Sequence, residues 1–386
     1  MAGGIQAVLR FQKVPTDFCM NQHDAFRLLS QLTLGGSEIS APCYASRCEE
    51  QAKIGGTLGN LTERGWSEFE SLASANHVIV RAFRAIRVRM ASENYSPCTA
   101  WAEHAIEAEQ ARISYALSCL EPICEALEDA GRVTVIKSLD HWPDLGNDLD
   151  LYTDAEAPAV VAIMRSRFNA RVERQSWGDR MANKWNFIVP GLPEPVEVHV
   201  GRLGQMGEQN LIGKSVTASA GGAKFGTHSF RVPSAEDRIL ISTLQRMYRH
   251  FYIRLCDVLD IARLIEEDLV DYDYLRSLAQ LAGIWEGVAT YLKIVNEYVK
   301  EFRGAGLALP AYITSAARFG MEQVHFARNF LRVRVLPYCA QLYAAELSRL
   351  LWNGEIVSTL RLSLMPALAT AAALKHKLTD SDKGIW

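Results

Sequence analysis

Apolar residues recur at three- and four-residue spacing over most of residues 21–130. The pattern is clear in DAFRLLSQL, in GWSEFESLASANHVIVRAFRAIRVRMA and in TAWAEHAIEAEQARISYALSCLEPICEALEDAG. This spacing puts apolar side chains on one face of a helix, and Gly131 after the last run suits a helix C-terminus. We expect a helical N-terminal region without a strand of any length.

The pattern changes after residue 130. RVTVIKS is short and β-branched, DLDLYT alternates, and APAVVAIMRSRFNA has the period of a helix that begins near a proline. RVERQSW, KWNFIVP and PVEVHVG follow as three further strand candidates bounded by Gly, Pro and Asp. The order β, β, α, β, β, β predicts a small mixed sheet with a helix on it.

From residue 231 onward the chain returns to helical spacing, beginning with AEDRILISTLQRMYRHFYIRLCDVLDIARLIEE. The predicted fold class is therefore α+β, with a helical region at 1–130, an α/β core at 131–230 and a helical region at 231–386. The glycine-rich stretch before the last region, GRLGQMGEQNLIGKSVTASAGGAKFGTH, predicts either a flexible connection or a lid that brings Lys214 or Lys224 near phosphate. Its IGKS is no phosphate loop, because the glycine needed five residues earlier is Glu208.

Composition narrows the class of protein. The chain has 386 residues, 49% of them hydrophobic and 22% charged, which is too apolar for disorder. A net charge of −3 argues against generic binding to DNA or to anionic lipid. No secretory signal is evident and the longest apolar runs fall short of the roughly 20 residues that a membrane span needs, so we expect a soluble cytoplasmic protein without a membrane partner.

Eight cysteines fit that expectation. Cys43 and Cys48 are five apart, as are Cys119 and Cys124, which is neither the spacing of common zinc sites nor a dense disulfide framework. We predict reduced and mostly buried thiols.

Two acids stand close together in NDLDLYT. Asp148 and Asp150 share one face of a strand, since side chains two apart point the same way. A later strand, VEVHV, carries Glu197 between two valines, with His199 on the same face. Three acids from two strands are a usual ligand set for two magnesium ions in phosphoryl or nucleotidyl transfer. The alternative is that these acids lie solvated on an exposed edge strand.

VIKS, NDLDLYT and VEVHV together resemble the DNA polymerase β superfamily of nucleotidyltransferases, and most of all a bacterial branch with a helical N-terminal region. The similarity covers roughly residues 20 to 300 and includes the segment VPSAEDRILISTLQRMYRHFYIRLCDVLDIARLIEE. Two departures stand out: Ser138 replaces the glycine that follows the lysine in that branch, and the third acid is Glu197 rather than an aspartate.

The resemblance implies roles for these residues. Asp148 and Asp150 would hold two Mg²⁺ ions, or Mn²⁺, and Glu197 would bind the catalytic ion or accept the proton of the acceptor. Lys137 and Ser138 would contact the β- and γ-phosphates of the nucleoside triphosphate (NTP).

Other polar residues allow two interpretations each. In one interpretation His199 contacts the nucleotide or the acceptor. In the other it is a partly buried strand histidine with a local hydrogen bond. Arg249 or Arg254 faces the triphosphate, or belongs to a salt-bridge network with Asp257 and Asp260 on one helical segment. A hairpin tip, GDRMANK, lies between Trp177 and Trp185, whose rings stack on a base or pack in the core.

The resemblance implies a magnesium-dependent, ATP- or other NTP-binding transferase that moves a nucleoside monophosphate to a hydroxyl or phosphate acceptor and releases pyrophosphate. Residues 131–254 carry 16 Lys and Arg against 13 Asp and Glu, a modest excess that favours a small-molecule acceptor over RNA or protein. Two other classes stay open: a catalytically silent regulator that binds nucleotide or a partner protein on the same fold, and a helical scaffold.

Overall fold

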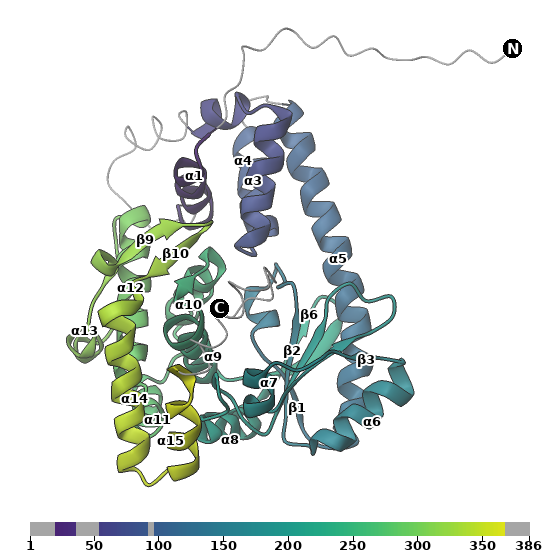
Figure 1. The fold of residues 1–386 in the computed structure, drawn as a ribbon. Helices are drawn as coiled ribbons and strands as arrows, with labels where there is room; N and C mark the ends of the chain where they lie inside the picture. The colour runs from purple at the N-terminus through teal and green to yellow at the C-terminus, as the bar shows by residue number, and fades with distance from the viewer. Residues whose placement is uncertain (1–19, 36–53, 92–95, 367–386) are drawn as a thin grey trace, which may run out of the picture.

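The computed structural model describes residues 20–35, 54–91 and 96–366, and the chain has the α+β fold class that we expected (Figure 1). The N-terminal region is helical throughout its described part. Besides residues 54–59, its helices are α1 (Gln22–Leu34), α3 (Glu63–Ala75), α4 (Ile79–Ala91) and α5 (Ser96–Glu128). Cys43 and Cys48 lie outside the described residues.

The apolar run 65–91 forms two helices rather than one. Thr62 caps the start of α3 by accepting a hydrogen bond from the backbone of Gly65. Asn76 ends the helix by donating from its side chain to a backbone carbonyl one turn earlier, and His77 then takes a left-handed conformation with φ 51°. The chain therefore turns back at this point, and α4 packs beside α3.

The predicted sheet is confirmed. Five strands lie in the order β1 (Val133–Val135), β2 (Leu149–Thr153), β5 (Val196–Val200), β4 (Lys184–Ile188) and β3 (Arg171–Val172). β2 and β5 are parallel and every other neighbouring pair is antiparallel. The expected helix, α6 (Ala157–Phe168), follows β2 and packs against α5.

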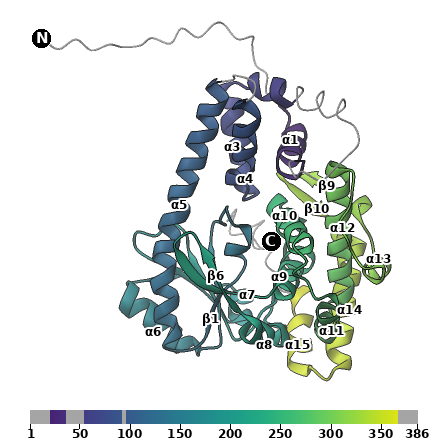
Figure 2. The ribbon, with the colours of Figure 1, turned by 180° about the vertical axis from the view of Figure 1, so that it is seen from behind.

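The sheet separates two hydrophobic clusters. Leu149 and Leu151 of β2 are fully buried in one cluster with α5, α6 and the valines of β5. Tyr152 points to the opposite face and belongs to the other cluster, which joins the N-terminal helices to the C-terminal ones. The long helix α5 contributes to both clusters, and Figures 1 and 2 show it running from the N-terminal helices to the sheet. The face of β2 that carries Asp150 is thus turned toward the helical half of the molecule.

The structure contradicts the flexible connection expected for the glycine-rich stretch, whereas the lid stays a prediction. Residues 210–232 form α8 (Asn210–Ser219) and a hairpin of β6 (Gly221–Phe225) and β7 (His228–Val232). Ile212 and Val216 are buried one turn apart in α8, so this segment has a local apolar face that the glycines around it obscured. Lys214 and Lys224 are exposed and make no contact with the acids.

The stretch between the two tryptophans connects the antiparallel neighbours β3 and β4, as predicted for a hairpin tip, but it contains a short helix. Residues Trp177–Ala182 form a short helix, α7, because Ser176 and Asp179 make a capping box at its start. Trp177 is exposed, whereas Trp185 packs partly buried against the cluster around the sheet.

The C-terminal region is mostly helical but contains a small sheet that the pattern did not predict. Strands lie in the order β8 (Tyr252–Ile253), β10 (Phe330–Val333) and β9 (Val324–Ala327). The helices are α9 (Ala235–Thr243), α10 (Leu255–Glu266), α11 (Tyr272–Leu281), α12 (Trp285–Arg303), α13 (Ala311–Ala316), α14 (Ala340–Trp352) and α15 (Ile356–Ser363).

The single helical segment expected to carry Arg249, Arg254 and Asp257 is broken. After α9 the chain continues as a π-helix, Leu244–His250, and Phe251 then takes a left-handed conformation with φ 55°. β8 follows, and α10 starts only at residue 255. This break places Arg249 and Arg254 on different elements.

None of the helices in the described part of the chain is both long and apolar enough to cross a membrane. The described cysteines form no disulfide: Cys98, Cys256 and Cys339 are buried, and Cys119 and Cys124 are half-buried.

Candidate active site on the inner strands

The turn after β1 holds the acidic strand in place. Lys137 has a positive φ of 59°, and a 3-10 turn starts at Ser138. The Ser138 hydroxyl accepts a hydrogen bond from the Asp150 amide (2.8 Å) and donates one to the Asp148 carbonyl (3.1 Å). Ser138 is buried and its hydroxyl is used by the protein itself, so its observed contact is with the acidic strand, whereas the predicted contact was with phosphate.

The acids lie on inner strands, so the interpretation as a solvated edge strand is wrong. Asp150 of β2 is directly opposite Glu197 of β5 in the parallel register, and Tyr152 is opposite His199. Asp150, Glu197 and His199 offer ligand atoms that all lie within 4.8 Å of one another. Only 3% of Asp150 is exposed, and such a buried carboxylate needs a cation.

Two lysines meet this need in the structure. The Lys137 ammonium pairs with Asp150 and lies 3.5 Å from Glu197 Oε1. The Lys184 ammonium lies 3.0 Å from Glu197 Oε2, and His199 Nε2 lies 2.8 Å from Glu197 Oε1. Both oxygens of Glu197 are therefore engaged by neighbouring side chains, and the observed contact of His199 is the local one.

The charges shift the pKa values in the directions that this geometry requires. Burial alone would lower the pKa of Lys137, but the carboxylates of Asp150 and Glu197 raise it above its usual range. Burial would raise the pKa of Glu197, but the cations Lys137 and Lys184 and the His199 hydrogen bond lower it well below its usual range. Lys137 and Glu197 thus keep their charges through neutral pH.

Asp148 differs from the other two acids. It precedes β2, is half-buried, and its carboxylate makes no hydrogen bond or ion pair with any other described residue. Repulsion from Asp150, together with burial, raises the pKa of Asp148 to about 6. A carboxylate that is crowded by another and has no cation of its own is a site where an added cation relieves repulsion.

The residues present therefore fit a divalent metal ion at Asp148 and Asp150. Both side chains supply hard oxygen ligands, and Asp148 supplies an unpaired one. Glu197 fits less well as a metal ligand, because Lys184 and His199 already occupy its oxygens. Metal binding by the three predicted acids stays a prediction, and the unpaired carboxylate of Asp148 makes Asp148 and Asp150 the better candidates.

The predicted basic residues lie on the segment around Phe251. The Arg254 guanidinium is over the rings of Tyr252 (5.6 Å) and Phe330 (5.8 Å), and its charge lowers the pKa of Asp148. Arg249 is half-buried and has no hydrogen bond or ion pair with another described residue. Burial, and then the charge of Arg249, keep the pKa of His250 well below its usual range.

The expected salt-bridge network exists, but it is buried and has other partners. Asp257 pairs with the fully buried Arg246 (2.7 Å) and accepts a hydrogen bond from the backbone of Arg254. Asp260 pairs with Arg81 of α4 (2.8 Å). The Arg254 guanidinium is left for other contacts, since neither acid bonds to it.

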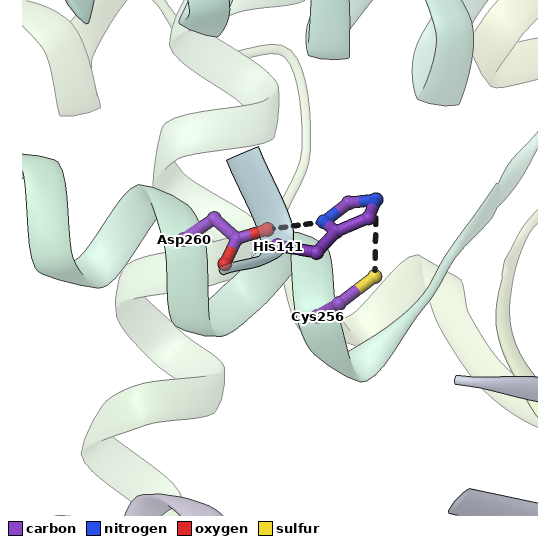
Figure 3. Close-up of side chains that lie close together, drawn as sticks. All are labelled: His141, Cys256 and Asp260. Atoms are coloured by element: carbon purple, nitrogen blue, oxygen red, sulfur yellow. Dashed lines mark hydrogen bonds and ion pairs between the residues drawn. The ribbon is translucent and has the colours of Figure 1, made fainter. Parts of the chain in front are cut away.

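A second group of buried polar side chains consists of His141, Cys256 and Asp260 (Figure 3). His141 Nδ1 is 2.5 Å from Asp260, and Cys256 Sγ is 3.8 Å from His141 Nε2. The arrangement is that of a nucleophile, a base and an orienting acid, but Cys256 is fully buried and burial raises its pKa. A thiol in that state is inert. We interpret the group as a set of buried polar contacts that connects the loop before β2 to α10.

Lys184 and Arg246 were missed by sequence reasoning. Lys184 starts β4 and lies opposite His199, a relation that only the strand register reveals. One sequence feature could have identified Arg246: it stands four residues before His250 in a strongly basic segment.

No family model matches the chain, and no curated protein or solved structure matches it either.

Proposed function

We propose that this protein is a magnesium-dependent nucleotidyltransferase that moves a nucleoside monophosphate from an NTP to an acceptor and releases pyrophosphate. One observation carries the proposal: the parallel pairing of β2 and β5 puts Asp150 opposite Glu197, beside a turn that holds Asp148 at the rim of the same site. The resemblance in VIKS, NDLDLYT and VEVHV agrees with it. We place the reaction in the cytoplasm.

Each residue of the site would have a separate role in this reaction. Asp148 and Asp150 would hold Mg²⁺, which when bound supplies charge stabilisation for the transferring phosphoryl group. Lys137 offers a fixed ammonium beside them, and Arg249 and Arg254 offer guanidinium groups for the triphosphate. Ser138 keeps the backbone of the acidic strand in place, and this rigidity is what positions reacting groups.

Glu197 has a supporting role in this proposal. Its two oxygens hold Lys184 and His199, and its charge helps keep Lys137 beside Asp150. It therefore positions the cations of the site, and it neither binds metal directly nor takes the acceptor's proton.

The ion pairs around Asp150 and Glu197 favour a second candidate, a catalytically silent regulator. Because lysines and a histidine engage Glu197 and Lys137 pairs with Asp150, these acids are neutralised without a metal. Such a protein would bind an NTP without turning it over.

The first test is thermal unfolding of the wild type and of Asp148→Asn/Asp150→Asn with each of the four NTPs, with magnesium and with chelator. A ligand that binds only the folded state raises the melting temperature in proportion to occupancy. We expect a magnesium-dependent shift for at least one NTP, which the double variant loses. Glu107→Gln, an exposed change on α5, is the matched control and should keep the shift.

The second test separates the two candidates. Pyrophosphate release from the NTP that shifts the melting temperature is measured with a pool of small hydroxylated acceptors. Release that needs both an acceptor and Asp148 supports the transferase. Binding of the NTP with no release under any acceptor condition supports the regulator, and no NTP binding at all rejects both.

A further inference from the structure

The hairpin of α14 and α15 exposes many large apolar side chains, and Figures 1 and 2 show it at the edge of the molecule. Six of these side chains, between 49% and 86% exposed, form what we call the α14–α15 surface: Leu351, Trp352, Ile356, Val357, Leu360 and Leu364. Together they leave roughly 700 Å² of apolar surface in water, more than the largest apolar patch of a typical monomer. Such a surface usually marks a binding site for a partner.

The helix α15 is apolar on two opposite sides. Ser358 and Leu362, four residues apart, are buried on the side that packs against α14. Ile356, Leu360 and Leu364 repeat at the same spacing on the outer side, and Leu364, directly after the helix, still has helical backbone angles. A helix that is apolar all round is normally buried. On its outer side, α15 therefore lacks a neighbour among the described residues.

Hydrogen bonds fix the hairpin to the rest of the chain. The Glu346 carboxylate of α14 accepts from Gln209 (2.6 Å), and Arg361 of α15 donates to the Gly207 carbonyl (3.2 Å). Between the two helices, the Tyr343 hydroxyl donates to the carbonyl of Leu362 (2.7 Å). Because both helices are already held in place, binding of a partner costs little ordering entropy.

We infer that the α14–α15 surface binds a second copy of this chain around a two-fold axis at Leu360. The spacing of the outer side supports this arrangement, because positions 356, 360 and 364 read the same in both directions. When two copies of α15 lie antiparallel, Ile356 meets Leu364 of the second copy and Leu360 meets its own counterpart. A two-fold interface requires such self-complementarity. This inference does not depend on the proposed function.

The size of the surface also fits a dimer. The six side chains alone supply most of the about 800 Å² that each partner buries in a standard protein–protein interface. Charge disfavours an anionic membrane, since helices that lie on membranes carry many Lys and Arg, whereas residues 349–366 contain only Arg349, Glu355 and Arg361 as charged residues. Residues 367–386 of the same chain are a further candidate occupant, which the experiment distinguishes.

The first experiment is sedimentation equilibrium of the full chain over a wide range of concentrations. We expect the wild type to reach twice the mass of one chain. Leu360→Glu puts two carboxylates together at the axis and should raise the dissociation constant about a hundredfold or more. Val88→Glu, the same change at a 69% exposed residue of α4, is the matched control and should leave the dissociation constant unchanged. Circular dichroism of each variant checks that the monomer is folded.

A second experiment tests the arrangement without adding charge. With oxidised glutathione, Leu360→Cys should form a disulfide with its counterpart and run as a covalent dimer on a non-reducing gel, whereas wild type and Val88→Cys should not. A mixture of Ile356→Cys and Leu364→Cys should cross-link more than either variant alone. A wild type that is monomeric at every concentration would overturn the second copy as occupant and favour residues 367–386. A dimer that survives Leu360→Glu, or that gives no Leu360→Cys cross-link, would overturn the two-fold arrangement.

Discussion

Replacing Asp148 with asparagine should stabilise the metal-free protein, although it removes a residue of the proposed site. Repulsion from Asp150 and burial raise the pKa of Asp148 from 3.8 to about 6. Between these values the folded state keeps a proton that the unfolded chain has lost, so stability falls as pH rises through this window. A shift of about two units corresponds to about 3 kcal/mol of unfolding free energy, which is lost in full above the folded pKa.

The assay is urea unfolding in chelator at pH 4 and pH 8. Asparagine has the shape of the protonated acid, so Asp148→Asn and wild type should be similar near pH 4. At pH 8 the variant should be more stable, by up to about 3 kcal/mol. The exposed Glu107→Gln variant should show no such difference. Equal stability of wild type and Asp148→Asn at both pH values would refute the argument that the two acids repel each other without a metal.

Three further changes test the packing and charges around the site. Glu197→Gln removes one of the two carboxylates from each of two buried ammonium groups, since Lys137 keeps Asp150 and Lys184 keeps Asp179, and should cost about 2 kcal/mol in urea unfolding. His141→Gln should destabilise most at low pH: partners that include Asp260 raise the pKa of His141 well above its usual range, so its contribution is lost as pH rises through that folded pKa. Gly131→Ala puts a Cβ 2.6 Å from a backbone nitrogen of the loop after β2 and should lower the melting temperature, unlike Gly221→Ala, which meets open space.

The acidic strand could be predicted because its signal is local. Alternation at a period of two puts Asp148 and Asp150 on one face and the leucines on the other, and burial of Leu149 and Leu151 in the cluster behind the sheet follows from that pattern. The pairing with Glu197 was predictable in the same way, since it needed only one further strand with an acid between valines.

The cations around the acids could not be predicted, because they depend on register and on backbone bends. Lys184 reaches Glu197 only because β4 is antiparallel to β5 with Asn186 opposite Glu197. Arg254 lies near Asp148 only because a π-helix and the left-handed Phe251 interrupt what the spacing predicts as one helix. Both features come from contacts between distant segments, and the local spacing of apolar residues does not predict them.

The charges of the site explain why metal and nucleotide binding should depend on each other. The carboxylates of Asp148, Asp150, Glu197 and Asp179 face the ammonium groups of Lys137 and Lys184 and the guanidinium of Arg254, which leaves one negative charge in excess. A triphosphate approaching this metal-free site meets a carboxylate at its rim, and the repulsion is strong because half-buried groups are poorly screened. One divalent ion at Asp148 reverses the sign of the balance. In the proposed function the two lysines supply charge that a second ion would otherwise bring, so we expect a single metal ion to be enough to make the site attractive to an NTP.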